Sequence, residues 1–267
     1  MIDIQSQRDT RRMAIDKVGV KNVRYPMRVK MRSGGEQHTV AQIHMSVNLP
    51  HHFRGTHMSR FLEVLNAHRA ELDRESFFEI LRSMRRRLHA ERSHMEMRFP
   101  YFLVKEAPVS GACSLFDVEA IFIGEAACRR GEANGADDCD FEFTLGVRVA
   151  VKTLCPCSKE ISARGAHNQR GFMTVFLRFD GSFWIEDLVD IVESCASAPI
   201  YPLLKRPDEK WVTERAYDNP KFVEDLVRDV ALRLGAEPRI AAWTVESENF
   251  ESIHNHSAYA FMEGRNG

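Results

Sequence analysis

The sequence predicts an α+β protein made of two fused modules, each with the order strand, strand, helix, helix. Short stretches in both halves alternate apolar and polar residues, which is typical of strands with one buried face. Behind each group of strands, apolar residues recur at helical spacing. The same order appears twice along the 267 residues, although no repeat is visible letter by letter. We therefore expect antiparallel sheets covered by helices.

The first module follows a charged, weakly periodic segment, residues 1–24, which we interpret as an N-terminal arm. Tyr25–Lys30 and Thr39–Asn48 alternate in polarity about the turn Ser33-Gly34-Gly35 and are predicted to form a hairpin. Two predicted helices come next, with apolar faces within Phe61–Leu65 and Phe77–Leu88.

The second module, predicted to span residues 96–267, carries more strands than the first, residues 25–95. Its predicted strands are Met97–Lys105, Leu115–Ile123, Phe141–Val151 and Phe172–Phe179. Gly124–Asp140 is rich in glycine, alanine and acidic residues, and it is predicted to be a long exposed hairpin tip. A helix is expected at Ile185–Ala196, since its apolar residues fall on one face.

The last predicted helix has boundary signals at both ends. Asn219 can cap its first turn, Pro220 suits the first helical position, and Gly235 follows its end at Leu234. A final strand, Ala241–Ser247, leads into a histidine-bearing tail. Because antiparallel sheet edges need partners, we expect another subunit to complete them.

The composition describes a folded protein without a strong overall field. Hydrophobic residues make up 44% and charged residues 28% of the chain, and the net charge is −1. This balance gives no general attraction to nucleic acid or to an anionic membrane. No apolar run approaches the ~18–20 residues that span a bilayer, and the first residues lack the apolar core of a secretory signal. We expect a cytoplasmic protein, in which clustered cysteines bind metal or do chemistry more often than they form disulfides.

Cys155, Cys157 and His167 are the strongest candidates for a chemical site. The cysteines follow a strand-like run and are separated only by Pro156, and the histidine comes shortly after them. Thiolate and imidazole are the usual ligands of zinc and suit other divalent metals. Pro156 is expected to hold the pair in an extended turn, so that one sulfur can bind a metal while the other faces a substrate. The alternative is a loop with two inert thiols and a solvated histidine.

Three further polar segments add candidates. Residues 246–256 hold three carboxylates and two histidines, and His254 and His256 share a face if the chain is extended there. His51–Arg60 concentrates cations before a helix, which suits an anion. Lys205–Lys210 links two predicted helices. Each also has a simpler interpretation: residues 246–256 could be a surface strand, His51–Arg60 a helix-capping loop, and Lys205–Lys210 a solvated loop.

Together, these motifs resemble those of the prokaryotic type IB GTP cyclohydrolases, over nearly the whole chain. The matching segments are Asp9-Thr10-Arg11, Ala14–Lys21, Pro50–Phe61, Cys155–Glu160, Gly165–Arg170, Leu204–Lys210, Tyr217–Asp229 and Val245–Tyr259. The resemblance implies a tunnelling fold (T-fold), in which subunits pair into β-barrels and form a homotetramer. It also implies hydrolysis of GTP at C8, release of formate, and ring closure to 7,8-dihydroneopterin triphosphate, the first step of tetrahydrofolate and pterin biosynthesis.

The resemblance further implies roles for individual residues in catalysis. The implied metal ligands are Cys155, His167, Glu209 and His254, a mixed set that accepts Mn, Fe or Zn. A bound metal would activate the water that attacks C8. Cys157 or His256 would donate a proton to N7 and make C8 electrophilic.

The resemblance also implies substrate contacts. Glu224, in the first turns of a helix, is expected to accept the N1–H and 2-amino hydrogens of guanine, with Glu251 as the competitor for that role. The triphosphate is expected to meet Lys159, Arg170 or the loop that contains His51 and Arg60, in the same subunit or a neighbouring one.

Two alternatives remain open. Another tunnelling-fold enzyme could process a pterin or deazapurine, and a nitrile reductase of this kind would use a cysteine without a metal. A non-catalytic regulator could bind a metal or a nucleotide and would release no formate from GTP. Metal content would distinguish the nitrile reductase from a metal-dependent cyclohydrolase. Formate release from GTP would distinguish a cyclohydrolase from a regulator.

Overall fold

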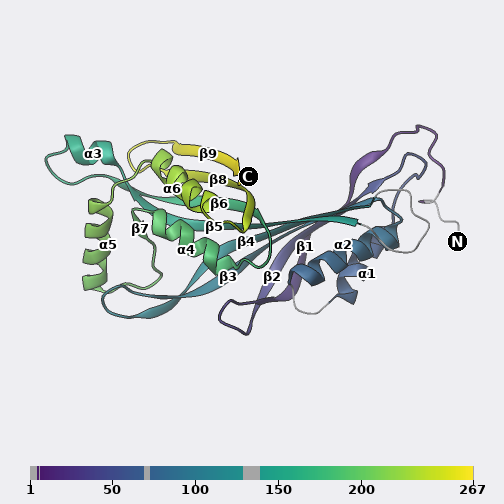
Figure 1. Ribbon diagram of the computed structural model, residues 1–267, viewed down its shortest axis with the longest axis horizontal. Helices are drawn as coiled ribbons and strands as arrows, with labels where there is room; N and C mark the ends of the chain where they lie inside the picture. The colour runs from purple at the N-terminus through teal and green to yellow at the C-terminus, as the bar shows by residue number, and fades with distance from the viewer. Residues whose placement is uncertain (1–4, 6, 69–72, 129–138, 267) are drawn as a thin grey trace. The chain divides into compact units, whose positions relative to one another are not determined.

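The computed structural model describes residues 5, 7–68, 73–128 and 139–266. Its strands are β1 (Ile15–Lys30), β2 (Glu36–Leu49), β3 (Arg92–Glu106), β4 (Cys113–Cys128), β5 (Cys139–Leu154), β6 (Asn168–Phe179), β7 (Ala198–Pro199), β8 (Ile240–Phe250) and β9 (Ser257–Arg265). Its helices are α1 (Met58–Ala67), α2 (Arg74–Leu88), α3 (Pro156–Ile161), α4 (Ile185–Cys195), α5 (Arg206–Asp218) and α6 (Val223–Gly235) (Figure 1). In this part of the chain, no helix is long and apolar enough to cross a membrane.

The strands join one nine-stranded sheet. Its order is β1-β2-β3-β4-β5-β6-β8-β9, and the short β7 pairs with β5. Strand pairs along this order, such as β1 with β2 and β6 with β8, are antiparallel. The chain divides into two compact units: unit 1 comprises residues 1–99 and 121–144, and unit 2 comprises residues 100–120 and 145–267.

The prediction of a tunnelling fold, with two fused ββαα modules and antiparallel sheets, was wrong. The first half does show the order β1, β2, α1, α2, but β3, β4 and β5 then follow with no helix between them in the described residues, which omit 129–138. These three strands are 15, 16 and 16 residues long, and each contributes to both units. Strands of about 5–6 residues are usual, and the strands predicted here, Met97–Lys105, Leu115–Ile123 and Phe141–Val151, were shorter than the observed ones. Their unexpected length joins the strands of both halves into one sheet.

The core of unit 1 lies between its strands and its two helices. Alternate residues of β2, including Ile43 and Met45, are buried. Phe77 of α2 is fully buried and meets Phe122 and Phe143 edge-on, with ring centroids 6.3 and 5.4 Å apart. The apolar face predicted within Phe77–Leu88 is therefore the packing face of α2.

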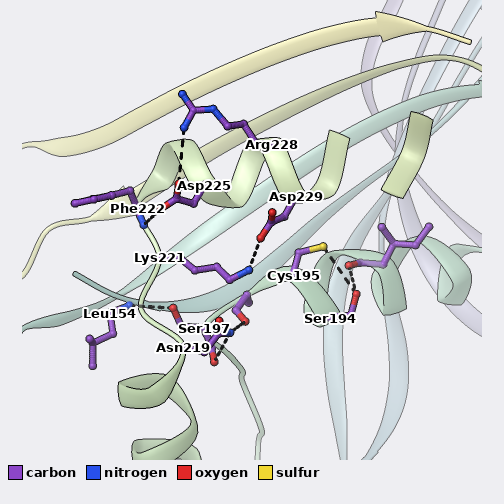
Figure 2. A network of polar contacts seen from close by, with 12 residues as sticks. Leu154, Ser194, Cys195, Ser197, Asn219, Lys221, Phe222, Asp225, Arg228 and Asp229 are labelled. Atoms are coloured by element: carbon purple, nitrogen blue, oxygen red, sulfur yellow. Dashed lines mark hydrogen bonds and ion pairs between the residues drawn. The ribbon is translucent and has the colours of Figure 1, made fainter. Parts of the chain in front are cut away.

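In unit 2, α6 packs on β8 and β9, and α4 packs beside α6. A polar network fixes the link before α6 (Figure 2). Asn219 donates its side-chain amide to the carbonyls of Ala196 and Ser197, at 3.0 and 3.3 Å. Lys221 donates its backbone N–H to the carbonyl of Leu154 at 3.0 Å and pairs through its ammonium group with Asp229. The link is thereby fastened to the end of β5.

Several predicted boundaries differ from the structure. Strand β1 begins at Ile15, within the segment predicted to be an arm, and β9 lies in the tail. Asn219 ends α5 instead of capping the next helix, because its amide is used by Ala196 and Ser197. Helix α6 starts after Phe222, whose N–H is capped by the Asp225 carboxylate at 3.0 Å. Of the predicted tip at 124–140, residues 129–138 lie outside the described residues.

Lys205–Lys210, predicted as a link, begins α5. Asp208 is fully buried there and accepts hydrogen bonds from the backbone of Val109 and Lys205 and from the backbone and hydroxyl of Ser110, at 2.6–2.8 Å. Burial alone would raise the pKa of this carboxyl, but the hydrogen bonds outweigh it and hold the pKa well below its usual range. Asp208 therefore ties the start of α5 to the turn after β3.

We predict that Phe77→Ala lowers the free energy of unfolding by about 3–5 kcal/mol, because it leaves a cavity among packed aromatic rings. Urea denaturation followed by circular dichroism measures the change. Leu115→Ala on β4 is the control, since Leu115 is 61% exposed. A loss for Phe77→Ala no larger than that of the control would contradict this packing.

Candidate functional site

Cys155 and His167 face each other where β5 ends and β6 begins. The β5–β6 register pairs Leu154 with Asn168, and Cys155 and His167 are the next residues along it. The backbone N–H of Cys155 donates to the carbonyl of His167 at 3.1 Å. Strand pairing therefore brings together Cys155 and His167, which stand at the two ends of the connection between β5 and β6.

Ser158, which the sequence interpretation did not single out, fastens the two candidates to each other. Its hydroxyl accepts the backbone N–H of His167 and donates to the carbonyl of Cys155, both at 3.1 Å. This is possible because Cys155 is the N-cap of the short helix α3, whose first residue is Pro156. The predicted extended turn is thus a helix start. Cys155 is half-buried and Cys157 is exposed, and both thiols are free.

His167 has polar neighbours from the segment that follows β8. Its Nδ1 lies 3.4 Å from the Ser252 hydroxyl and 3.9 Å from Oε2 of Glu251. Gln169 donates its side-chain amide to Oε1 of the same carboxylate at 3.2 Å. The side chains of His167 and Glu251 are only 15% and 12% exposed. The structure therefore gathers Cys155, His167 and Glu251 at one end of the sheet in unit 2.

The other two predicted metal ligands lie on separate segments. Glu209 is exposed in the first turn of α5. His254 is exposed in the β8–β9 connection, where its ring stacks on His256 with centroids 5.1 Å apart. Among the residues that the structure describes, no group of three or more His, Cys, Asp or Glu side chains is arranged to hold a metal ion. The thiol and imidazole of Cys155 and His167 do have the donor chemistry of a divalent metal site, and they lie at the same strand ends.

Three of the predicted substrate contacts lie on separate elements of unit 2. Glu224 is exposed in the first turn of α6. Lys159 of α3 donates to the carbonyl of Tyr217 and lies over its ring, 4.3 Å from the centroid. Arg170 is exposed on the face of β6 opposite to Gln169, and its cross-strand neighbour is Lys152. Burial lowers the pKa of the Lys152 ammonium group.

His51 and Arg60 belong to unit 1. His51 is exposed, with its ring edge-on to that of His52 at 5.3 Å. Arg60, in the first turn of α1, donates to the carbonyl of Arg87 at 3.0 Å. Its guanidinium group therefore already supports the packing of α1 against the end of α2.

Unit 1 also contains a cavity of about 430 Å³ that the sequence interpretation did not identify. Across it, Glu125 of β4 accepts from Lys17 of β1 at 3.3 Å and contacts Nδ1 of His94 of β3 at 2.8 Å. Burial, and then the charge of Lys17, lower the pKa of His94. Burial would raise the pKa of Glu125, but Lys17 and His94 outweigh this and lower it. The signal in the sequence was the segment Ala14–Lys21, in which the charged residues Asp16, Lys17 and Lys21 stand within a strand pattern.

Comparison with known proteins gives a family and a fold. Residues 1–260 match the family described as type I GTP cyclohydrolase folE2. The GTP cyclohydrolase FolE2 proteins of Nitrosococcus oceani and Methylococcus capsulatus are both 58% identical to this chain over 261 residues, which is 98% of this chain and 94% of each relative.

Several urate oxidases are among the solved structures that resemble this chain. The enzyme from Bacillus sp. TB-90 aligns with a TM-score of 0.57 and 10% identity, covering 95% of this chain and all of that one. The enzyme from Bacillus subtilis aligns with a TM-score of 0.55 and 8% identity, covering 95% and 98%. At this identity the likeness concerns the fold alone, and a urate oxidase-like fold replaces the predicted description as ββαα modules.

The resemblance that the sequence motifs carried is confirmed at the level of the enzyme class, because both the family model and the relatives extend over nearly all of the chain. The chain belongs to the type I GTP cyclohydrolase folE2 family.

Proposed function

We propose that this protein is a GTP cyclohydrolase that converts GTP and water to 7,8-dihydroneopterin triphosphate and formate, in the cytoplasmic route to tetrahydrofolate and pterins. The observation that carries the proposal is the 58% identity to GTP cyclohydrolase FolE2 proteins over 98% of the chain. The cluster of Cys155, His167 and Glu251 supports it from the structure. A thiol, an imidazole and a carboxylate can bind a metal or transfer protons, and both are uses that a hydrolysis at a ring carbon can make of them.

Cys155 and His167, with Glu209 and His254, are the residues that would hold a divalent metal, Mn, Fe or Zn. Such an ion would supply Lewis-acid activation of the attacking water. The Cys155–His167 backbone hydrogen bond and the two contacts of Ser158 hold these two residues at the strand ends, which supports their assignment as the first two ligands. Glu209, at the start of α5, and His254, in the β8–β9 connection, are the other two proposed ligands and would have to approach Cys155 and His167 to bind the same ion.

The proton that N7 of guanine requires is assigned to Cys157 or His256. Cys157 is exposed on the first turn of α3, one residue from the N1 proline and two from Cys155. His256 stacks on His254, so a proton donor at His256 would stand beside a proposed ligand. Protonation at N7 withdraws electrons from the imidazole ring and makes C8 open to attack.

Glu224 is the proposed acceptor for the N1–H and 2-amino group of guanine, since two carboxylate oxygens match two donors. It is exposed at the start of α6, in the segment that Lys221 fastens to the end of β5. The triphosphate is assigned to Lys159, Arg170, His51 and Arg60. Lys159 stands on the same short helix as Cys157 and would exchange its contact with Tyr217 for a phosphate oxygen.

The protein is further proposed to act as a homo-oligomer, with a tetramer as the expected state. The end strand β9 carries exposed large apolar side chains, among them Tyr259 and Phe261, which are 60% and 48% exposed. Apolar residues on an unpaired edge strand favour association. Light scattering during gel filtration measures the mass of the assembly.

We expect chelator-stripped protein to lose GTP turnover and to regain it when Mn, Fe or Zn is added under reducing conditions. Formate and oxidised neopterin fluorescence are measured together, and the ranking of the metals identifies the best one. GTP that survives every metal while the protein stays folded would rule out the proposed reaction, and pterin or deazapurine substrates would then be tested.

The two cysteines are predicted to have separate roles. Cys155→Ala should lose bound metal and activity together, because it removes a ligand. Cys157→Ala should keep its metal and lose turnover by about 10²–10⁴-fold, the usual contribution of a general acid. Metal analysis of the purified proteins and formate release measure both effects, and Cys113→Ala, an exposed free thiol outside the proposed site, is the control. An empty metal site in Cys157→Ala would reverse the two assignments.

Glu224→Gln should weaken GTP binding by about 10- to 100-fold, because a charged acceptor of two hydrogen bonds becomes neutral. The dissociation constant for GTP is measured on metal-free protein, beside that for ITP, which lacks the 2-amino group. The variant should lose most of the preference of the wild type for GTP over ITP. Glu263→Gln, on β9, is the control, and an unchanged preference in Glu224→Gln would assign the guanine to another residue.

A further inference from the structure

The covered face of β5, β6 and β8 changes from apolar to polar along its length. At one end it carries Val149, Met173 and Val245, all fully buried. At the other end its residues are polar and still covered: Thr153, Gln169, Ser247 and Asn249 are 0–7% exposed. The strand register places Thr153 beside Gln169 and Asn249 beside Gly171, on the same side of the sheet.

These polar side chains are not saturated with hydrogen bonds. Within the described residues, Oγ1 of Thr153, Oε1 of Gln169 and Oδ1 of Asn249 are buried and have no hydrogen-bond partner. Buried polar groups of this kind are rare in folded proteins, and each calls for an explanation, such as a catalytic role or a bound water or ion. A polar end to an otherwise apolar face therefore points to a use beyond packing.

Thr153, Gln169, Ser247 and Asn249 form a polar seam at this end of the face, and Gly171 makes room for it. A Cβ atom at residue 171 would lie 2.4 Å from Oδ1 of Asn249 and 2.7 Å from the carbonyl of Glu248. The Asn249 side chain consequently lies over the backbone of β6, next to Gln169 on the same strand face. Asn249 thereby occupies one side of Gln169, and Glu251 is the next residue of that row, beyond the end of β8.

Gln169 is the member of the seam that reaches the candidate site. Its side-chain N–H donates to Oε1 of Glu251 at 3.2 Å, which leaves Oε2 facing Nδ1 of His167 at 3.9 Å. The second distance is that of an electrostatic contact rather than a hydrogen bond. With Nδ1 facing a carboxylate and the Ser252 hydroxyl, the tautomer that is favoured carries its hydrogen on Nδ1 and presents a lone pair on Nε2.

We propose that Gln169 is a positioning residue, which holds the Glu251 carboxylate so that this carboxylate orients the imidazole of His167 for metal binding through Nε2. The inference rests on the proposed metal site at Cys155 and His167. It gives Glu251 a role beside the metal ligand and leaves the guanine edge to Glu224. The roles divide because Glu251 is covered and already engaged, whereas Glu224 is exposed.

The test is metal affinity in the absence of GTP. In Gln169→Met, which keeps the length of the side chain and loses the amide, affinity for Zn²⁺ and Co²⁺ should fall about 10- to 100-fold, the usual effect of losing a partner that orients a ligand. Competition with a chelator gives the affinities, and the thiolate-to-cobalt absorption band reports whether Cys155 is still bound. Asn168→Ala, an exposed neighbour on the other face of β6, is the control.

A second variant keeps the test decisive if Gln169→Met is poorly folded. Glu251→Gln should weaken metal binding to a similar degree, and the double variant should lose no more than the stronger single one, because both act through the same imidazole. Thermal melting checks that each protein is folded.

Three outcomes would overturn the proposal. Unchanged metal affinity with weaker GTP binding to the metal-free protein would place Glu251 on the substrate. Complete loss of metal in Glu251→Gln would make Glu251 a ligand itself. Unchanged affinities for both metal and GTP would make Gln169 a packing residue only. The affinity measurements need no turnover. If the variants bound metal more weakly and the wild type hydrolysed no GTP, the proposed function would be refuted and the positioning role of Gln169 would stand.

Discussion

The register of β5, β6 and β8 is the constraint on which the site depends. The sum of paired residue numbers is constant along the β5–β6 ladder, so fixing Thr153 opposite Gln169 also fixes Cys155 opposite His167. The β6–β8 ladder extends the same row to Glu251. A slip of one residue would turn every side chain of a strand to the other face of the sheet. The apolar residues that fix the register in the core therefore also decide which side chains meet at the strand ends.

The cost of this arrangement lies at the polar end of the covered face. Burying an amide or hydroxyl without a full set of hydrogen bonds opposes folding by about 1–3 kcal/mol for each group. Thr153, Gln169 and Asn249 all sit in such positions. The apolar part of the same strands, together with α4 and α6, supplies the burial that offsets this cost. The apolar residues that stabilise unit 2 and the polar residues of the candidate site thus lie on successive stretches of β5, β6 and β8.

What the sequence could predict depended on distance along the chain. Cys155, Pro156 and Cys157 are adjacent, and His167 follows closely, so residue type and spacing were enough to choose them. The same local signals identified the hairpin of β1 and β2 and the packing face of α2. The contact of Gln169 with Glu251 joins residues 82 positions apart, and it becomes visible only when the β6–β8 register is known.

Local signals gave wrong predictions where a side chain forms hydrogen bonds with residues that are distant in the sequence. Asn219 followed by a proline has the pattern of a helix start, yet its amide is spent on the carbonyls of Ala196 and Ser197. Asp208 stood in a stretch of charges that is typical of a solvated loop, yet it is buried and holds the turn at Val109 and Ser110. The single long sheet was missed for a similar reason, since no short window shows that β3, β4 and β5 continue from one unit into the other.

The two carboxylates considered for the guanine edge have the same residue type and differ in their placement. Glu224 and Glu251 offer the same pair of acceptor oxygens, and both stand in segments that the family motifs cover. One oxygen of Glu251 is committed to Gln169 and the other faces His167, so a guanine edge at Glu251 would have to displace both neighbours. Glu224 is exposed on the first turn of α6, and that turn is held near the end of β5 by Lys221. The edge of guanine that carries two donors meets fewer competing contacts at Glu224 than at Glu251. The covered Glu251 is therefore better suited to orienting His167, and the exposed Glu224 to receiving the base.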